Sequence, residues 1–169
     1  MWRRIVEFFR DSPQRLKVAQ AIVGHGFSVD GPGEIKCGEI RIPLQCLGNA
    51  LGIDRRTVRA TTEDICTQDD LCKFFKELRP AGPSLEGVRS VLGYGVVTIF
   101  VESPENPGIL SEVTSMIAGY GIPIRQVIAE DVAIYPEPCL KVITQNPLPG
   151  RVIETLAAIR GVRKVIIDK

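Results

Sequence analysis

The sequence lacks a surplus of charge of either sign. Its 21 basic and 20 acidic residues leave a formal net charge of +1 over 169 residues. A chain so close to neutral has no general electrostatic attraction to nucleic acid or to an anionic membrane, so a DNA-binding hypothesis needs a local basic cluster. The chain also lacks any run of about 18 apolar residues, the minimum for a membrane-spanning helix. Its first residues, MWRRIVEFFRD, lack the apolar core of a signal peptide. We therefore expect a cytoplasmic protein with no membrane partner.

Paired cysteines and histidine clusters are also missing. The five cysteines are odd in number and include no CxxC pair, so we expect reduced, buried thiols. A metal site built from Cys66, Cys72 and His25 is the alternative, but these residues do not have the usual ligand spacing. We predict no metal and no cofactor.

Sequence signatures of catalysis are scarce. His25, the single histidine, lies between two glycines and has no acidic neighbour in sequence, which is typical of a turn. The chain contains no nucleotide-binding glycine pattern, no HExxH and no GxSxG. We expect that the protein is not an enzyme.

The pattern of apolar residues changes near the middle of the chain. Residues 79–84, RPAGPS, are rich in residues that break regular structure. Before them, apolar residues mostly recur at helical spacing, whereas after them runs of β-branched residues alternate with two helical patterns. We predict an α+β protein with a mainly helical domain at 1–80, a linker at 81–94 and a second domain at 95–169.

In the first domain, residues 2–10 and 13–23 have the pattern of helices. Residues 27–42 contain the turn sequence DGPG and a weak alternation, which predicts a short hairpin or an extended arm. The next segment, LQCLGNALGIDRRTVR at 44–59, has Gly52 where a left-handed turn residue is needed and Asp54 where a second helix would begin. Gly48 is small where two helices would cross, and Ile53 fills the angle between them. This segment resembles the helix-turn-helix unit of DNA-binding proteins.

That resemblance implies a DNA-contacting surface on the second helix, which we expect over residues 55–66. Its first turns carry three arginines within five positions. In helix-turn-helix units this end of the helix reaches base edges, and arginine also holds phosphates. The DNA-binding residues are then Arg55, Arg56, Thr57 and Arg59. A structural or protein-contacting helical hairpin is the alternative, because small helix-Gly-helix units are common.

The second domain reads as strand, helix, strand, strand, helix, strand. The strands are expected at 96–101, 122–130, 139–144 and 162–168, and the helices follow NPG and NPLPG. In the second strand, Ile122, Ile124 and Gln126 are expected on one face and Val127 on the other. This βαββαβ order predicts a ferredoxin-like sheet of antiparallel strands with both helices on one face, and many unrelated domains share it.

Two short motifs add a functional expectation. NPGIL at 106–110 and GIPI at 121–124 resemble the first loop and second strand of ACT domains, which bind amino acids and other small effectors. The resemblance implies a ligand site made by Asn106, Gly108, Ile109, Leu110, Ile122, Pro123 and Ile124. Pro123 stands where serine-binding members carry asparagine, and Ser103 replaces a histidine of their loop. We therefore expect a neutral or apolar amino acid as the ligand.

The chemistry of the first motif fits a carboxylate. Gly108 lets the backbone approach a ligand, and free N–H groups at a helix start attract an anion. Gly108→Val is accordingly expected to block binding and leave the helix, and hence the fold, largely intact. The alternative is a capped helix start that binds nothing, in a domain that only assembles subunits.

Taken together, the two domains are similar to the archaeal predicted regulators of amino-acid metabolism, in which a helix-turn-helix-like region precedes an ACT domain. The resemblance implies an amino-acid-responsive regulator that contacts DNA. The alternative is a regulatory subunit that acts on a biosynthetic enzyme by protein contact. The strand at 96–101 is apolar on both faces, and helices can cover only one, so we predict a homodimer. The effector is expected at its interface, between residues 106–110 and 122–126.

Overall fold

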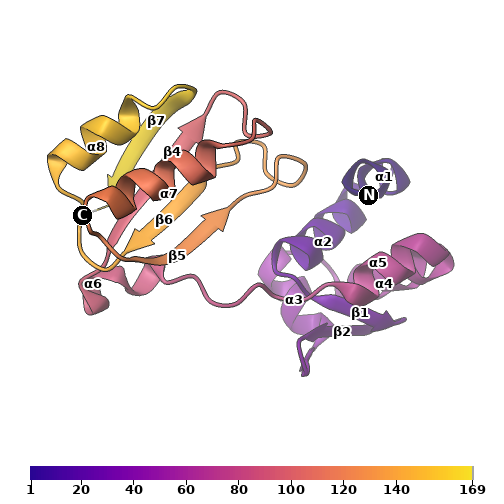
Figure 1. The fold of residues 1–169 in the computed structure, drawn as a ribbon. Coiled ribbons are helices and arrows are strands. Elements are labelled where there is room, and N and C mark those ends of the chain that lie inside the picture. The colour runs from indigo at the N-terminus through magenta and orange to yellow at the C-terminus, as the bar shows by residue number, and fades with distance from the viewer. Residues whose placement is uncertain (169) are drawn as a thin grey trace. The chain divides into compact units, whose positions relative to one another are not determined.

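A computed structural model describes residues 1–168 of the chain. It consists of two compact units, Met1–Gly82 and Pro83–Lys169, and each is described by itself (Figure 1). Helices and two antiparallel sheets confirm the α+β class. No helix within residues 1–168 is both long and apolar enough to cross a membrane.

The first unit combines five helices with a small sheet. Its elements are α1 (Trp2–Phe8), α2 (Pro13–Gly24), β1 (Ser28–Gly31), β2 (Glu34–Cys37), β3 (Ile40–Ile42), α3 (Leu44–Leu51), α4 (Arg55–Thr67) and α5 (Asp69–Glu77). Apolar side chains from both kinds of element are fully buried, among them Ile22, Ile35, Ile65 and Phe75. A single core therefore joins the helices to the sheet.

The sheet of this unit goes beyond the hairpin or extended arm expected for residues 27–42. Its three strands are antiparallel in the order β1-β2-β3. Val29 and Ile35 are paired across β1 and β2, and both are fully buried. Gly33, at φ 77°, completes the turn between these strands, a conformation that favours glycine. A description of this unit as mainly helical therefore leaves out part of its core.

The second unit has the βαββαβ order. After a short η1 (Glu86–Val88) and α6 (Arg89–Leu92), its elements are β4 (Gly95–Val101), α7 (Ile109–Gly119), β5 (Ile124–Ala129), β6 (Leu140–Thr144), α8 (Gly150–Ala157) and β7 (Val162–Asp168). The strands are antiparallel to their neighbours in the order β5-β6-β4-β7. Helices α7 and α8 lie on the same face of this sheet (Figure 1). Their buried residues Val113 and Leu156 share a core with Ile99 and Val142 of the sheet.

Residues 83–94, which we call the connecting segment, belong to the second unit rather than forming a separate linker with residues 81 and 82. They lie against the other face of the sheet. Glu86 Oε2 is 2.9 Å from Nζ of Lys141, which alternates with the core residues Leu140 and Val142 along β6. The side chain of Gln126 donates to the carbonyl oxygen of Pro83 and accepts from the N–H of Leu85. The second face, which we expected to be partly bare in a single copy, is therefore covered in part by the chain itself.

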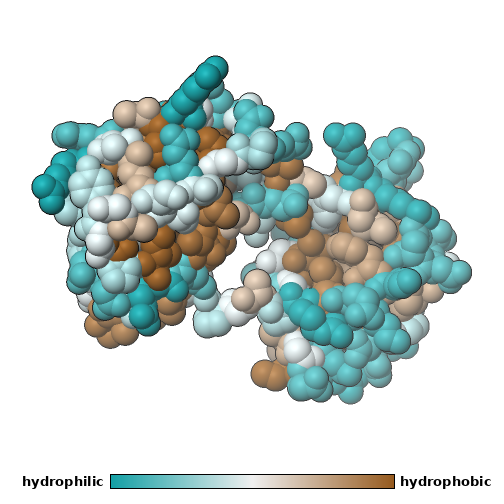
Figure 2. All heavy atoms as spheres, in the orientation of Figure 1, coloured by the Kyte–Doolittle hydropathy of each residue, from teal (hydrophilic) through white to brown (hydrophobic). Residues whose placement is uncertain are grey.

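The outer side of the connecting segment is apolar. Val91 is 85% exposed, and Val88 and Leu92 are also exposed. Figure 2 shows apolar atoms at the surface where Figure 1 places α6. The segment therefore covers one apolar face and presents another.

Candidate functional site

The start of α7 is set by Gly108. This residue has φ 103° and precedes the helix as its N-cap, without a side-chain cap. The first backbone bond of the helix runs from the N–H of Glu112 to the carbonyl oxygen of Gly108, at 2.9 Å. The N–H groups of Ile109, Leu110 and Ser111 come before this bond and have no partner within the helix. They are donors of the kind expected for a carboxylate.

A pocket of about 340 Å³ lies between this helix start and the adjoining ends of β5 and β6. Most of its lining is apolar. The lining residues are Val101, Pro104, Glu105, Asn106, Pro107, Gly108, Ile109, Leu110, Ala129, Glu130, Pro138, Cys139 and Leu140. The position fits the topology, because β4 and β5 both end where the chain enters α7.

Glu130 and Cys139 form the polar corner of this pocket. The N–H and the thiol of Cys139 both donate to Oε2 of Glu130, at 3.1 and 3.2 Å. The N–H of Glu130 donates in turn to the carbonyl oxygen of Cys139 at 3.0 Å. Burial, followed by the neighbouring Glu130 carboxylate, raises the pKa of the Cys139 thiol to about 11. This thiol is therefore protonated at neutral pH and is a poor nucleophile.

The pocket contains four of the seven residues predicted to bind the ligand: Asn106, Gly108, Ile109 and Leu110. The other three, Ile122, Pro123 and Ile124, lie beyond the far end of α7. That helix has 11 residues and so spans about 16 Å. Ile122 and Ile124 instead pack against the core beneath the helices. One copy of the chain does not bring the two predicted halves of the site together.

The predicted alternation of β5 is wrong after Ile124. The pairing with β6 shifts between Ile124 and Gln126, which leaves Arg125 as the extra residue of a bulge. Val127 therefore packs against the same core as Ile124. Gln126 lies on the other face, where it bonds to the connecting segment. A one-residue irregularity of this kind exchanges the faces of every later residue in the strand.

The variant Gly108→Val, expected to block ligand binding, would also strain the start of α7. No heavy atom lies within 4 Å of a Cβ added at Gly108, so space is available. The φ of 103°, however, is strained for any residue with a side chain, and most of all for a β-branched one. Loss of binding in Gly108→Val would therefore not separate a blocked site from a disturbed helix start.

The geometry of α3 and α4 matches the expectation for residues 44–66. Gly52 ends α3 in the left-handed conformation, with φ 67°. Oδ1 of Asp54 accepts a hydrogen bond from the N–H of Arg56 at 2.6 Å, which confirms Asp54 as the N-cap of α4. Ile53 and Val58 are both buried. The two helices are thus held by a short, well-defined turn.

The four predicted DNA-contacting residues differ in their surroundings. Arg55 and Arg56 are exposed, and neither forms an ion pair with the residues that the structure describes. Thr57 is half-buried. Arg59 is exposed, but its Nε lies 2.9 Å from Oε1 of Glu63, one turn further along α4. The first turn of α4 therefore carries two available guanidinium groups rather than three.

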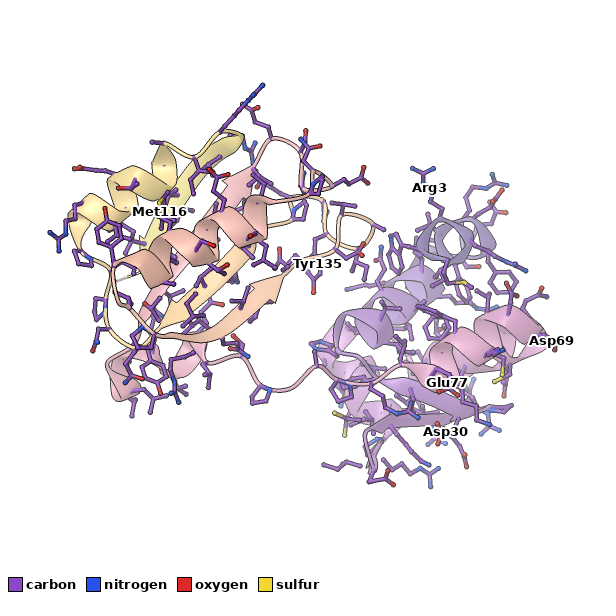
Figure 3. The ribbon with its side chains drawn as sticks, in the orientation of Figure 1. Arg3, Asp30, Asp69, Glu77, Met116 and Tyr135 are labelled. Atoms are coloured by element: carbon purple, nitrogen blue, oxygen red, sulfur yellow. The ribbon has the colours of Figure 1, made fainter. Side chains whose placement is uncertain are left out.

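One contact near this helix had no signal in the sequence. The N–H of Gly33, in the turn between β1 and β2, donates to Oγ1 of Thr62 at 2.7 Å. Thr62, fully buried, donates in turn to the carbonyl oxygen of Arg59. This contact fixes the hairpin turn against the middle of α4. On the same hairpin, an ion pair with Lys36 lowers the pKa of Asp30, which is labelled in Figure 3.

Cys66 and Cys72 are neighbours, but no third potential metal ligand among residues 1–168 joins them. His25 is exposed and stacks on the ring of Phe27, with 5.3 Å between ring centroids. Burial, followed by the neighbouring Cys72, raises the pKa of the Cys66 thiol to about 11. Within residues 1–168, no three histidine, cysteine or acidic side chains are arranged to hold a metal ion.

Comparison with known proteins gives no family. No family model matches the chain, and no curated protein matches it.

Proposed function

We propose that this protein is a cytoplasmic, amino-acid-responsive regulator in which the second unit binds a small amino acid and the first unit contacts DNA. The observation that carries the proposal is the pocket at the start of α7. It combines apolar walls with N–H groups that no residue of the helix satisfies. An α-amino acid with a neutral side chain has the matching pair of features, a carboxylate and an apolar group. The NPGIL and GIPI motifs, which resemble those of ACT domains, support the same role.

A thermal-shift screen of the twenty amino acids on the full chain tests this half of the proposal. A ligand that binds only the folded protein raises its apparent stability. We expect a neutral amino acid to raise the melting temperature and charged ones to have less effect. If none of the twenty changes it, the second unit is an assembly module rather than a sensor.

The DNA-binding half rests on the first turn of α4. Arg55 and Arg56 are exposed there, at the start of the second helix of a capped helix-turn-helix-like pair. Guanidinium groups in this position suit both phosphates and base edges. Fluorescence anisotropy at low salt, with duplex fragments and with or without amino acids, measures the binding directly. Absence of binding under both conditions would remove the DNA role.

The second candidate is a regulatory subunit that acts by protein contact and is not itself an enzyme. Two observations favour it over DNA binding. Arg59, one of the three predicted arginines, is paired with Glu63 of the same helix. The connecting segment also exposes Val88, Val91 and Leu92, a surface suited to another protein rather than to DNA. Amino-acid binding without DNA binding would favour this candidate.

We also propose that the protein is a homodimer. The reason is no longer an uncovered face of the sheet but the distance between the two predicted halves of the ligand site. Residues 106–110 and 122–124 lie at opposite ends of α7. A site that uses both must therefore take one from each of two copies, as expected from the sequence. Light scattering at tens of micromolar should give twice the monomer mass, and a monomer would restrict the effector to the pocket of one copy.

A further inference from the structure

The pocket at the start of α7 combines an apolar wall with one polar corner. The wall includes Val101, Ile109, Leu110 and Leu140. Glu130 is the one acidic side chain that lines the pocket from the sheet, at the end of β5. Glu105, the other acidic residue of the lining, is on the loop and exposed. A carboxylate next to an apolar surface is complementary to a cationic group on an apolar body.

Glu130 is held so that one of its oxygens stays available. Oε2 accepts both the N–H and the thiol of Cys139, which fixes the carboxylate in place. Oε1 makes no hydrogen bond with any residue in the described range 1–168. A carboxylate oxygen accepts more than one hydrogen bond and is most stable opposite a positive charge. The contact between Glu130 and Cys139, at the ends of β5 and β6, therefore uses only Oε2.

We propose that this pocket binds a small aliphatic primary amine, with its ammonium group on Oε1 of Glu130 and its alkyl group on the apolar wall. The inference rests on the ligand-binding role proposed above for the second unit, and it identifies the group that the pocket selects. Both a free alkylamine and the amino group of an α-amino acid supply this chemistry. An ammonium group donates up to three hydrogen bonds, and a carboxylic acid with the same alkyl chain places a second negative charge beside Glu130. The pocket therefore binds the amine more tightly than the acid, although the N–H groups at the start of α7 remain available to a carboxylate.

Three probes with one alkyl chain separate these groups: 3-methylbutylamine, L-leucine and 4-methylpentanoate. Isothermal titration calorimetry with the full chain should show that the amine and leucine bind more tightly than the acid. In Glu130→Gln, the amide oxygen still accepts from Cys139, so the fold is retained, but the charge is lost. We expect the affinity for the amine to fall at least tenfold, because the ammonium group loses the opposite charge and keeps only a hydrogen bond to a neutral amide oxygen.

The matched control is Glu112→Gln. Glu112 is an exposed carboxylate in the first turn of α7 and does not line this pocket. Glu112→Gln removes one negative charge near the start of α7 but none from the pocket lining, so it should leave the affinity for the amine unchanged. A second test uses only the wild type, so it does not depend on whether Glu130→Gln folds. Since Cys139 lines the pocket, 3-methylbutylamine should slow the alkylation of Cys139 by iodoacetamide at pH 9, whereas 4-methylpentanoate should not.

The outcomes separate this inference from the proposed function. Equal affinity of the amine for the wild type and Glu130→Gln, or binding of 4-methylpentanoate as tight as that of the amine, overturns the inference. If either result is found but leucine or another amino acid still binds, the proposed amino-acid-sensing role stands without the amine inference. If the amine binds through Glu130 and no amino acid does, the inference stands and the amino-acid role fails.

Discussion

Gly48 lies directly against the carbonyl oxygen of Ile53. A Cβ atom added at Gly48 would be 2.6 Å from that oxygen, closer than any real contact of this kind. The oxygen belongs to the backbone of the turn between α3 and α4, so a side-chain rotation cannot relieve the overlap. Glycine at this position therefore sets how closely α3 approaches the start of α4.

Gly48→Ala should destabilise the protein by about 1–3 kcal/mol, the usual cost of forcing extra atoms into a packed site. Urea denaturation of the full chain, followed by circular dichroism, gives the change in the free energy of unfolding. The control is Gly24→Ala, at the end of α2, where no atom lies within 4 Å of the added Cβ. If both variants have the same stability, the contact between the helices is looser than described.

Replacement of both Arg55 and Arg56 by Ala should weaken DNA binding and reduce its salt dependence. Each phosphate contact that is lost lowers the slope of log K against log salt by about 0.9. Arg59→Ala should have a smaller effect, because the guanidinium of Arg59 is already paired with Glu63 of the same helix. Arg10→Ala is the control, since Arg10 is exposed and has no ion pair among residues 1–168. Anisotropy titrations at several salt concentrations measure all three effects.

The protein should lose stability between about pH 9 and pH 11. Burial raises the pKa of the thiols of Cys66 and Cys139 to about 11 in the folded protein. Unfolded thiols ionise near pH 8.5. Between these values the unfolded chain has released protons that the folded chain retains, so the free energy of unfolding falls as pH rises.

Thermal melts across this pH range test the effect of the thiols, and Cys139→Ser should reduce the loss. Iodoacetamide at pH 8 should also modify the exposed Cys46 faster than Cys139. Equal rates at the two positions would contradict the raised pKa of Cys139.

The sequence predicts the features that depend on a few adjacent residues. The turn at Gly52, the cap at Asp54 and the βαββαβ order follow from local spacing, and the structure has all three. The β1-β2-β3 sheet was missed in part because its strands have only three or four residues, too few for a clear alternation. What fixes its turn is the bond from Gly33 to Thr62, 29 residues away, which no local pattern reveals.

In the candidate site, too, some parts follow from adjacent residues and others depend on contacts between distant ones. The loop at 106–110 is predictable as the start of a helix because its motif is contiguous, and the structure begins α7 there. Glu130 and Cys139 come together only because β5 and β6 pair, so nothing near either residue in sequence indicates the polar corner. The bulge after Ile124 likewise depends on pairing with β6, and it is why Gln126 faces the connecting segment rather than the core.

The connecting segment is held to the sheet by polar contacts, and we expect it to detach when they are broken. Glu86 and Lys141 are 25–29% exposed, and the hydrogen bond from Lys141 to Glu86 raises the pKa of Lys141. Glu86→Gln should destabilise the protein by about 1–2 kcal/mol, more than an exposed ion pair contributes. Because the pKa of Lys141 is raised on folding, this contribution is present at neutral pH and is lost as pH rises through that pKa.

Hydrogen exchange locates the effect of Glu86→Gln within the molecule. The N–H of Tyr94, bonded to the carbonyl oxygen of Arg89, should exchange faster, whereas amides of β4 and β6 should change little. The matched control is Glu137→Gln, which breaks the pair with Arg163, where both side chains are more than half exposed. That change should leave both stability and exchange near wild type. Uniform exchange in Glu86→Gln, with no local increase over residues 85–94, would mean that the segment unfolds only with the whole unit and that the ion pair between Glu86 and Lys141 does not hold it in place.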